Sequence, residues 1–96
     1  MTTAVLSAPK AQTKTNQKMS LQKIVSRNMR MAIAYYDVDQ QTVANAIGIS
    51  SSGVSLKMRG KVDWSLRDIE KASDFFNVKP EALVAGSGFE PETSGL

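Results

Sequence analysis

The sequence has no cysteine and no histidine among its 96 residues. Because these residues build disulfide frameworks, the common zinc sites and nucleophile–histidine pairs, all three kinds of chemistry are excluded. No apolar run approaches the roughly 20 residues that span a bilayer. The first apolar stretch, residues 4–6, is too short for a signal peptide. We therefore expect a cytoplasmic protein that uses no cofactor or metal and binds no membrane.

Acidic residues are missing from residues 1–36, which carry six basic ones: Lys10, Lys14, Lys18, Lys23, Arg27 and Arg30. Residues 68–96 show the opposite balance, with six acidic residues against two basic ones. The formal net charge is only +3, so the asymmetry is more informative than the total. A basic front suits a polyanion on one face, although a solvated surface with a basic tail explains the pattern equally well.

Apolar residues recur at helical spacing, and no strand pattern is present. We predict helices over residues 21–36, 40–47, 51–59, 66–76 and 80–84. Suitable residues mark their ends: Ser20, Asp39, Ser50 and Ser65 as N-caps, Gly48 as a C-cap and Pro80 in a first turn. The predicted fold class is all-α, with a flexible basic arm over residues 1–19, a compact five-helix domain over 20–85 and a flexible tail over 86–96.

The second and third predicted helices are joined by Gly48-Ile49-Ser50, the spacing of a helix-turn-helix motif. Val54 and Met58 are four residues apart and can face the core. The outer side of the third helix then carries Ser51, Ser52, Ser55, Leu56 and Arg59. Serine and glycine are poor helix formers, but a recognition helix enters the major groove of DNA by its N-terminal end. Small side chains there let the backbone approach the bases, and serine hydroxyls can bond several of them.

Residues 38–60, VDQQTVANAIGISSSGVSLKMRG, resemble the lambda-repressor-like helix-turn-helix family, which includes phage repressors and Cro-type regulators. The similarity continues through GKVDWSLRDIEKASDFFNVKPEAL. The resemblance implies a compact five-helix DNA-binding domain in a bacterial host cell. It also implies a transcriptional repressor, which we interpret as a temperate-phage immunity repressor that maintains lysogeny by occluding promoters at its operator.

The resemblance carries over to individual positions of this sequence. The implied DNA-binding residues are Gln40, Gln41, Ser50, Ser51, Ser52, Gly53, Ser55, Leu56, Lys57, Arg59 and Lys61, with Lys14 and Lys18 on the arm. Gln40 stands where the family bonds a phosphate, although a solvent-facing helix start is the alternative. Arg59 also suits a helix C-terminus by its charge alone. Lys57 stands where the family commonly has an apolar residue, so we do not assign it to the core.

Other functions stay open at this point. An antitoxin with the same fold would bind a neighbouring toxin protein, and a Cro-type lytic regulator would bind the same kind of DNA. We do not expect an enzyme or a small-molecule substrate, because acidic residues such as Asp39 and Asp68 stand where helix capping explains them. A weak or DNA-dependent homodimer would have to use the last two helices and the tail, with Phe75, Leu83, Val84 and Phe89 as its apolar residues.

The tail suggests a separate genetic hypothesis. Gly88-Phe89-Glu90-Pro91 can be encoded by codons that contain GGTTCGAACCC, which resembles the T-arm of a tRNA gene, and temperate phages often integrate at such genes. The nucleotide sequence of this stretch would test whether the gene overlaps an attachment site.

Overall fold

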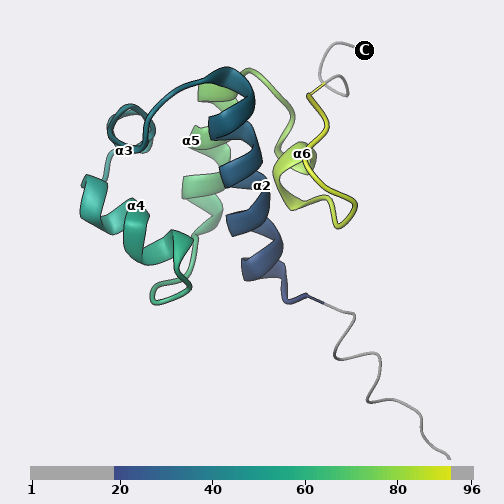
Figure 1. Ribbon diagram of the computed structural model, residues 1–96, viewed down its shortest axis with the longest axis horizontal. Helices are drawn as coiled ribbons and strands as arrows, with labels where there is room; N and C mark the ends of the chain where they lie inside the picture. The colour runs from purple at the N-terminus through teal and green to yellow at the C-terminus, as the bar shows by residue number, and fades with distance from the viewer. Residues whose placement is uncertain (1–18, 92–96) are drawn as a thin grey trace, which may run out of the picture.

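The computed structural model describes residues 19–91, which contain five helices and no strand (Figure 1). In chain order the helices are α2 (Leu21–Tyr36), α3 (Gln40–Ile47), α4 (Ser51–Met58), α5 (Leu66–Phe76) and α6 (Pro80–Val84). The all-α prediction is confirmed, and the helix bounds agree except that α4 ends one residue earlier. Residues 1–18 of the predicted basic arm, which include Lys14 and Lys18, lie outside the described residues. Residues 92–96 of the predicted tail lie outside them as well.

The helices begin where their capping residues stand. The Ser20, Asp39, Ser50 and Ser65 side chains each accept a hydrogen bond from a backbone N–H in the first turn of α2, α3, α4 and α5. At α5 the bond is reciprocal, because the Asp68 carboxylate also accepts from the Ser65 N–H at 2.8 Å. Such caps are worth about 1 kcal/mol each and offset the poor helix propensity of the serines in α4.

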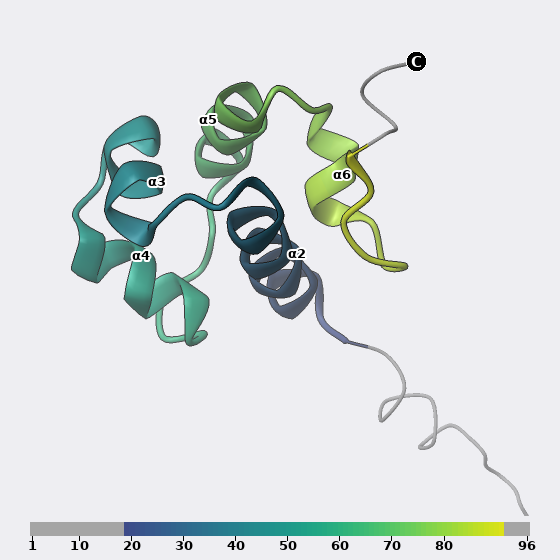
Figure 2. The ribbon, with the colours of Figure 1, turned by 45° about the horizontal axis from the view of Figure 1, so that its top comes forward.

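Helix α2 occupies the centre of the arrangement, with α3 and α4 on one side and α6 on the other (Figure 2). The largest fully buried apolar side chains come from four helices: Val25 and Met29 of α2, Val43 of α3, Val54 of α4 and Leu83 of α6. Burial of each such side chain contributes about 1.5–3 kcal/mol. The core therefore holds α4 against the rest of the domain by its inner face and leaves its other face open.

The helical spacing of Leu66, Ile69, Ala72 and Phe76 predicts that they form one apolar stripe, but Leu66 does not share the buried face of α5. Its side chain is 81% exposed, whereas Ile69, Ala72 and Phe76 are buried. Leu66 is the first residue of α5, where the capping box of Ser65 and Asp68 fixes the direction of the chain. The sequence interpretation was wrong at this residue because helical spacing alone cannot show that a stripe stops short of the helix end.

The sequence predicts a flexible tail from residue 86, but Phe89 is only 7% exposed. Its ring centroid lies 6.1 Å from that of Tyr36 and 6.5 Å from that of Phe76. Residues 86–91 therefore cover the end of the core instead of leaving it.

The residues expected at a dimer interface differ in exposure. Since Leu83 and Phe89 are buried within the chain, they cannot serve a dimer interface; Phe75, at 37% exposed, keeps free surface.

Candidate nucleic-acid interface

Helices α3 and α4 pack against each other across a tight turn. Gly48 ends α3 with a φ of 82°, in the left-handed region that glycine adopts at low cost. The backbone N–H groups of Gly48 and Ile49 both donate to the Ala44 carbonyl, at 2.9 and 3.0 Å. Ala44 itself is fully buried, so only a small side chain leaves room for this crossing. The predicted helix, glycine turn and second helix are all present.

The open face of α4 carries Ser52, Leu56 and Arg59 at spacings of four and three residues, which place them on one side of the helix. All three side chains are exposed, and Ser51 and Ser55 are half-buried beside them. No acidic residue lies within α4. The face combines small hydroxyl groups, one apolar side chain and a guanidinium group at the C-terminal end, which can approach a polyanion without repulsion.

The serine-rich start of α4 has structural reasons of its own. The Ser50 hydroxyl accepts from the Gly53 N–H at 3.0 Å and lies 3.2 Å from the Ser52 hydroxyl. A Cβ at Gly53 would lie 3.2 Å from Ser50 Oγ, tighter than most Cβ contacts. Glycine at this position therefore preserves the helix cap, whether or not DNA approaches. Ser50 acts as the cap, and the exposed Ser52 carries a second hydroxyl beside it.

The other candidate contacts have different surroundings. Gln40 is half-buried at the start of α3, and the exposed Gln41 donates to the side-chain oxygen of Asn45 at 3.1 Å. Arg59 follows the end of α4, and its Nε lies 3.4 Å from the Ser55 carbonyl oxygen, as expected for a cation that favours a helix C-terminus. Lys61 is exposed in the loop that follows.

Lys57 points inward, against the expectation that it stays outside the core. Its ammonium group forms an ion pair with the Asp68 carboxylate, and the two side chains are 14% and 7% exposed. Burial raises the pKa of Asp68, but the Lys57 ammonium and the Ser65 N–H outweigh it, so the pKa lies below its usual value. Lys57 therefore holds an internal partner and is not presented on the open face of α4.

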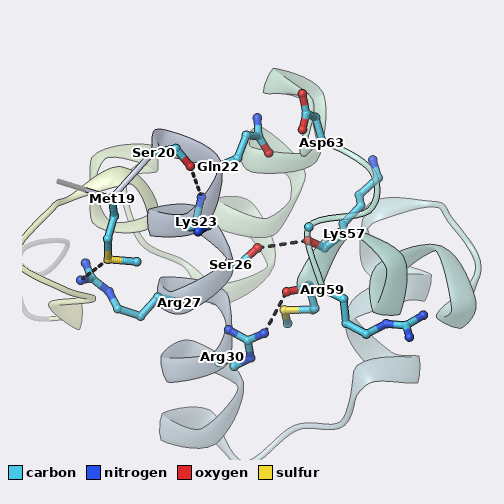
Figure 3. Close-up of a pocket in the computed structure, with 12 residues that line it drawn as sticks. Met19, Ser20, Gln22, Lys23, Ser26, Arg27, Arg30, Lys57, Arg59 and Asp63 are labelled. Atoms are coloured by element: carbon cyan, nitrogen blue, oxygen red, sulfur yellow. Dashed lines mark hydrogen bonds between the residues drawn. The ribbon is translucent and has the colours of Figure 1, made fainter. Parts of the chain in front are cut away.

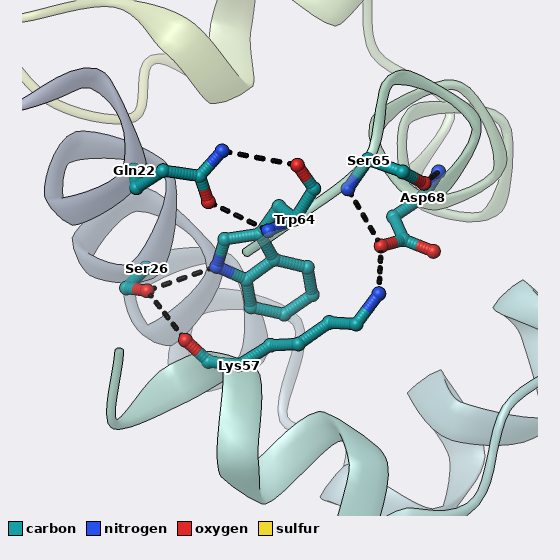
Figure 4. A network of polar contacts seen from close by, with 6 residues as sticks. All are labelled: Gln22, Ser26, Lys57, Trp64, Ser65 and Asp68. Carbon is teal, nitrogen blue, oxygen red and sulfur yellow. Dashed lines mark hydrogen bonds and ion pairs between the residues drawn. The ribbon is translucent and has the colours of Figure 1, made fainter. Parts of the chain in front are cut away.

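A buried polar network ties α4 to its neighbours (Figure 4). The Ser26 hydroxyl of α2 donates to the Lys57 carbonyl at 3.1 Å and accepts from the Trp64 indole N–H at 2.9 Å. Gln22 bonds the Trp64 backbone twice, donating to its carbonyl at 3.0 Å and accepting from its N–H at 2.6 Å. Together with the Lys57–Asp68 pair, these bonds fix the C-terminal end of α4 to both α2 and α5.

Sequence reasoning missed this network. Trp64, the single tryptophan, lies between the predicted helices over residues 51–59 and 66–76, and the sequence pattern gives no role to it, to Gln22 or to Ser26. The available signal was their spacing: Gln22 and Ser26 are four residues apart, so the two polar side chains share one face of the predicted helix. Because one hydroxyl bonds both Trp64 and Lys57, the network fixes the orientation of α4 relative to α2.

A short helix, a glycine turn and a second helix with an open polar face define the class: a helix-turn-helix DNA-binding protein. A family model described as the BetR domain matches residues 16–96, and the chain belongs to this family of helix-turn-helix DNA-binding regulators. No curated protein and no solved structure matches the chain. A DNA-binding regulatory role follows from the family membership.

Two further kinds of site are not found in the part of the chain that the structure describes. No group of three acidic, histidine or cysteine side chains lies close enough to hold a metal ion among residues 19–91. No helix over the same residues is long and apolar enough to cross a membrane.

Proposed function

We propose that the protein is a sequence-specific transcriptional repressor that inserts α4 into the major groove of operator DNA. The observation that carries the proposal is the contrast between the two faces of α4. Val54 and Met58 are buried on one face, whereas Ser52, Leu56 and Arg59 are exposed on the other. An α-helix fits the major groove, and these side chain types can read base edges there.

The chemistry of each residue suggests its part in recognition. The Ser52 hydroxyl, near the N-terminal end of α4, can donate to or accept from a base edge. Leu56, 37% exposed, can contact a thymine methyl group, and Arg59 can bond a phosphate. Because serine makes no bidentate contact, discrimination at each base pair is modest, and DNA shape contributes the remainder. The bound protein represses by occluding a promoter that overlaps the operator.

The biological role we infer is that of a temperate-phage immunity repressor. Its support is the resemblance of residues 38–60 to the phage repressors named above.

We also propose that the protein acts by binding and not by catalysis. The exposed Asp39 carboxylate accepts from the N–H and hydroxyl of Thr42 at 2.8 and 2.7 Å, and the Asp68 carboxylate is held by Lys57 and Ser65. Capping therefore accounts for both carboxylates.

Selection of binding sequences from random duplex DNA tests this proposal. The enriched sequence is then placed across a promoter that drives a reporter gene, with the scrambled sequence as the control promoter. Repression of the first reporter alone is the expected result. If no sequence is enriched, or if both reporters respond equally, sequence-specific repression is refuted.

A further inference from the structure

A groove of about 630 Å³ lies between the N-terminal half of α2 and the end of α4 with its following loop (Figure 3). Five basic residues line it, Lys23, Arg27, Arg30, Lys57 and Arg59, against one acidic residue, Asp63. Three of the five belong to the segment without acidic residues at the start of the chain. The fold thus brings that basic segment directly beside the recognition helix.

Two of the five cations, Arg27 and Lys57, have their charged groups engaged by partners within the fold. The Arg27 guanidinium donates to the carbonyls of Ala85 and Gly86 at 3.1 and 2.8 Å, and the Lys57 ammonium pairs with Asp68. These interactions hold the segment that follows α6, and the end of α4, in place. They leave Lys23, Arg30 and Arg59 as the cations that can serve a ligand in the groove.

The three remaining cations keep unused hydrogen-bond donors. Arg30 uses one terminal nitrogen to bond the Met58 carbonyl at 2.8 Å, which fixes the direction of its planar guanidinium group. Arg59 donates only from its Nε, to the Ser55 carbonyl. Lys23 is exposed on α2, and its ammonium group makes no hydrogen bond or ion pair with residues 19–91. A fixed guanidinium group and flexible ammonium group are well suited to phosphate oxygens.

Arg59 connects this groove to the open face of α4. It lies one helical turn beyond Ser55 and lines the groove as well. We propose that the groove binds the phosphate backbone of the same DNA duplex that α4 reads, with Lys23 and Arg30 of α2 as its phosphate ligands. This inference rests on the proposed function. It adds a contact surface on α2, outside the helix-turn-helix, whose contribution does not depend on base sequence.

The salt dependence of binding tests the inference in the full chain. Each phosphate contact contributes about 0.9 to the slope of log K against log salt concentration. Lys23→Gln should therefore lower the magnitude of that slope by about 0.9. At a salt concentration tenfold below the point where the variant and the unaltered protein bind equally, the variant should then bind roughly eightfold more weakly. The loss should be the same for the selected operator and for an unrelated duplex. Lys79→Gln, which removes the same charge at the start of α6 on the other side of α2, is the matched control and should keep the slope.

Arg30→Gln gives a second measurement, with thermal unfolding recorded in parallel because Arg30 also bonds the end of α4. A lowered slope in both Lys23→Gln and Arg30→Gln, with the unfolding midpoint of Lys23→Gln unchanged, supports the inference. Specific binding by the unaltered protein with an unchanged slope in both variants overturns it and leaves the proposed function standing; the groove would then suit an acidic protein segment. If the unaltered protein binds no DNA, both proposals fail.

Discussion

Replacement of Lys57 by methionine isolates the ion pair that holds the recognition helix. Methionine has similar length and can fill the same space, and an apolar residue at this position agrees with the family resemblance. The substitution leaves the buried Asp68 carboxylate without its cationic partner. We expect Lys57→Met to lower the free energy of unfolding, and to weaken DNA binding because the end of α4 loses one of its attachments.

The size of the effect follows from the surroundings of Asp68. A hydrogen bond to a charged group is worth about 1.5–3 kcal/mol, and loss of one partner of a fully buried pair costs about 3–5 kcal/mol. Asp68 keeps the Ser65 N–H at 2.8 Å, and the Lys57 side chain retains 14% exposure, so the lower range applies. A loss of about 2 kcal/mol should lower the unfolding midpoint by roughly 8–16 °C in a domain of this size.

Thermal and urea unfolding at neutral and acidic pH provide the assay. The pKa of Asp68 is lowered in the folded state, so its stabilising effect is fully present above its unfolded value of 3.8 and is lost as the pH falls through the lower folded value. The difference between Lys57→Met and the unaltered protein should therefore shrink as the pH falls below 3.8. Lys79→Met is the control for an exposed lysine. Equal stability of Lys57→Met and the unaltered protein at neutral pH would refute the reasoning.

Three further predictions concern other parts of the fold. Ser26→Ala leaves the buried Trp64 indole N–H without its acceptor, and it should cost about 1–3 kcal/mol in urea unfolding followed by tryptophan fluorescence; a change below a few tenths would show that the bond is dispensable. Phe89→Ala should cost about 3 kcal/mol, and unchanged stability would contradict the packed position of residues 86–91. The pKa of Asp39 is lowered below 3.8 by its hydrogen bonds to the side chain and backbone of Thr42, so helix content should fall as the pH drops through the pKa of the folded state. Asp39→Ala should lack that acidic step, and a step of equal size in the variant would point to another group.

The helices could be predicted because their signals are local. N-caps such as Ser20 and Ser65, the left-handed residue Gly48 and the proline at the start of α6 each act within one turn of chain. The division of α4 into a buried face and an open face also follows from its apolar spacing. These features need no knowledge of what packs against the helix, and the structure agrees with them.

The polar contacts could not be predicted because they join distant residues. The sequence alone gives Lys57 no partner in the core, because Asp68 is eleven positions away and reaches the Lys57 ammonium group only in the folded protein. Trp64 and Ser26 are 38 positions apart, and Phe89 meets an aromatic cluster formed by α2 and α5. Spacing within one helix carries no information on such partners, so sequence reasoning treated these residues as loop, surface or tail.

The central claim is that the open face of α4 reads DNA sequence. The most direct measurement is the ratio of dissociation constants for an unrelated duplex and the selected operator, in the unaltered protein, in Ser52→Ala and in Ser87→Ala. Loss of a hydroxyl contact worth about 1 kcal/mol should reduce that ratio roughly fivefold in Ser52→Ala. Ser87→Ala changes an exposed serine of the tail and should leave the ratio unaltered. An equal ratio in all three proteins would contradict the claim.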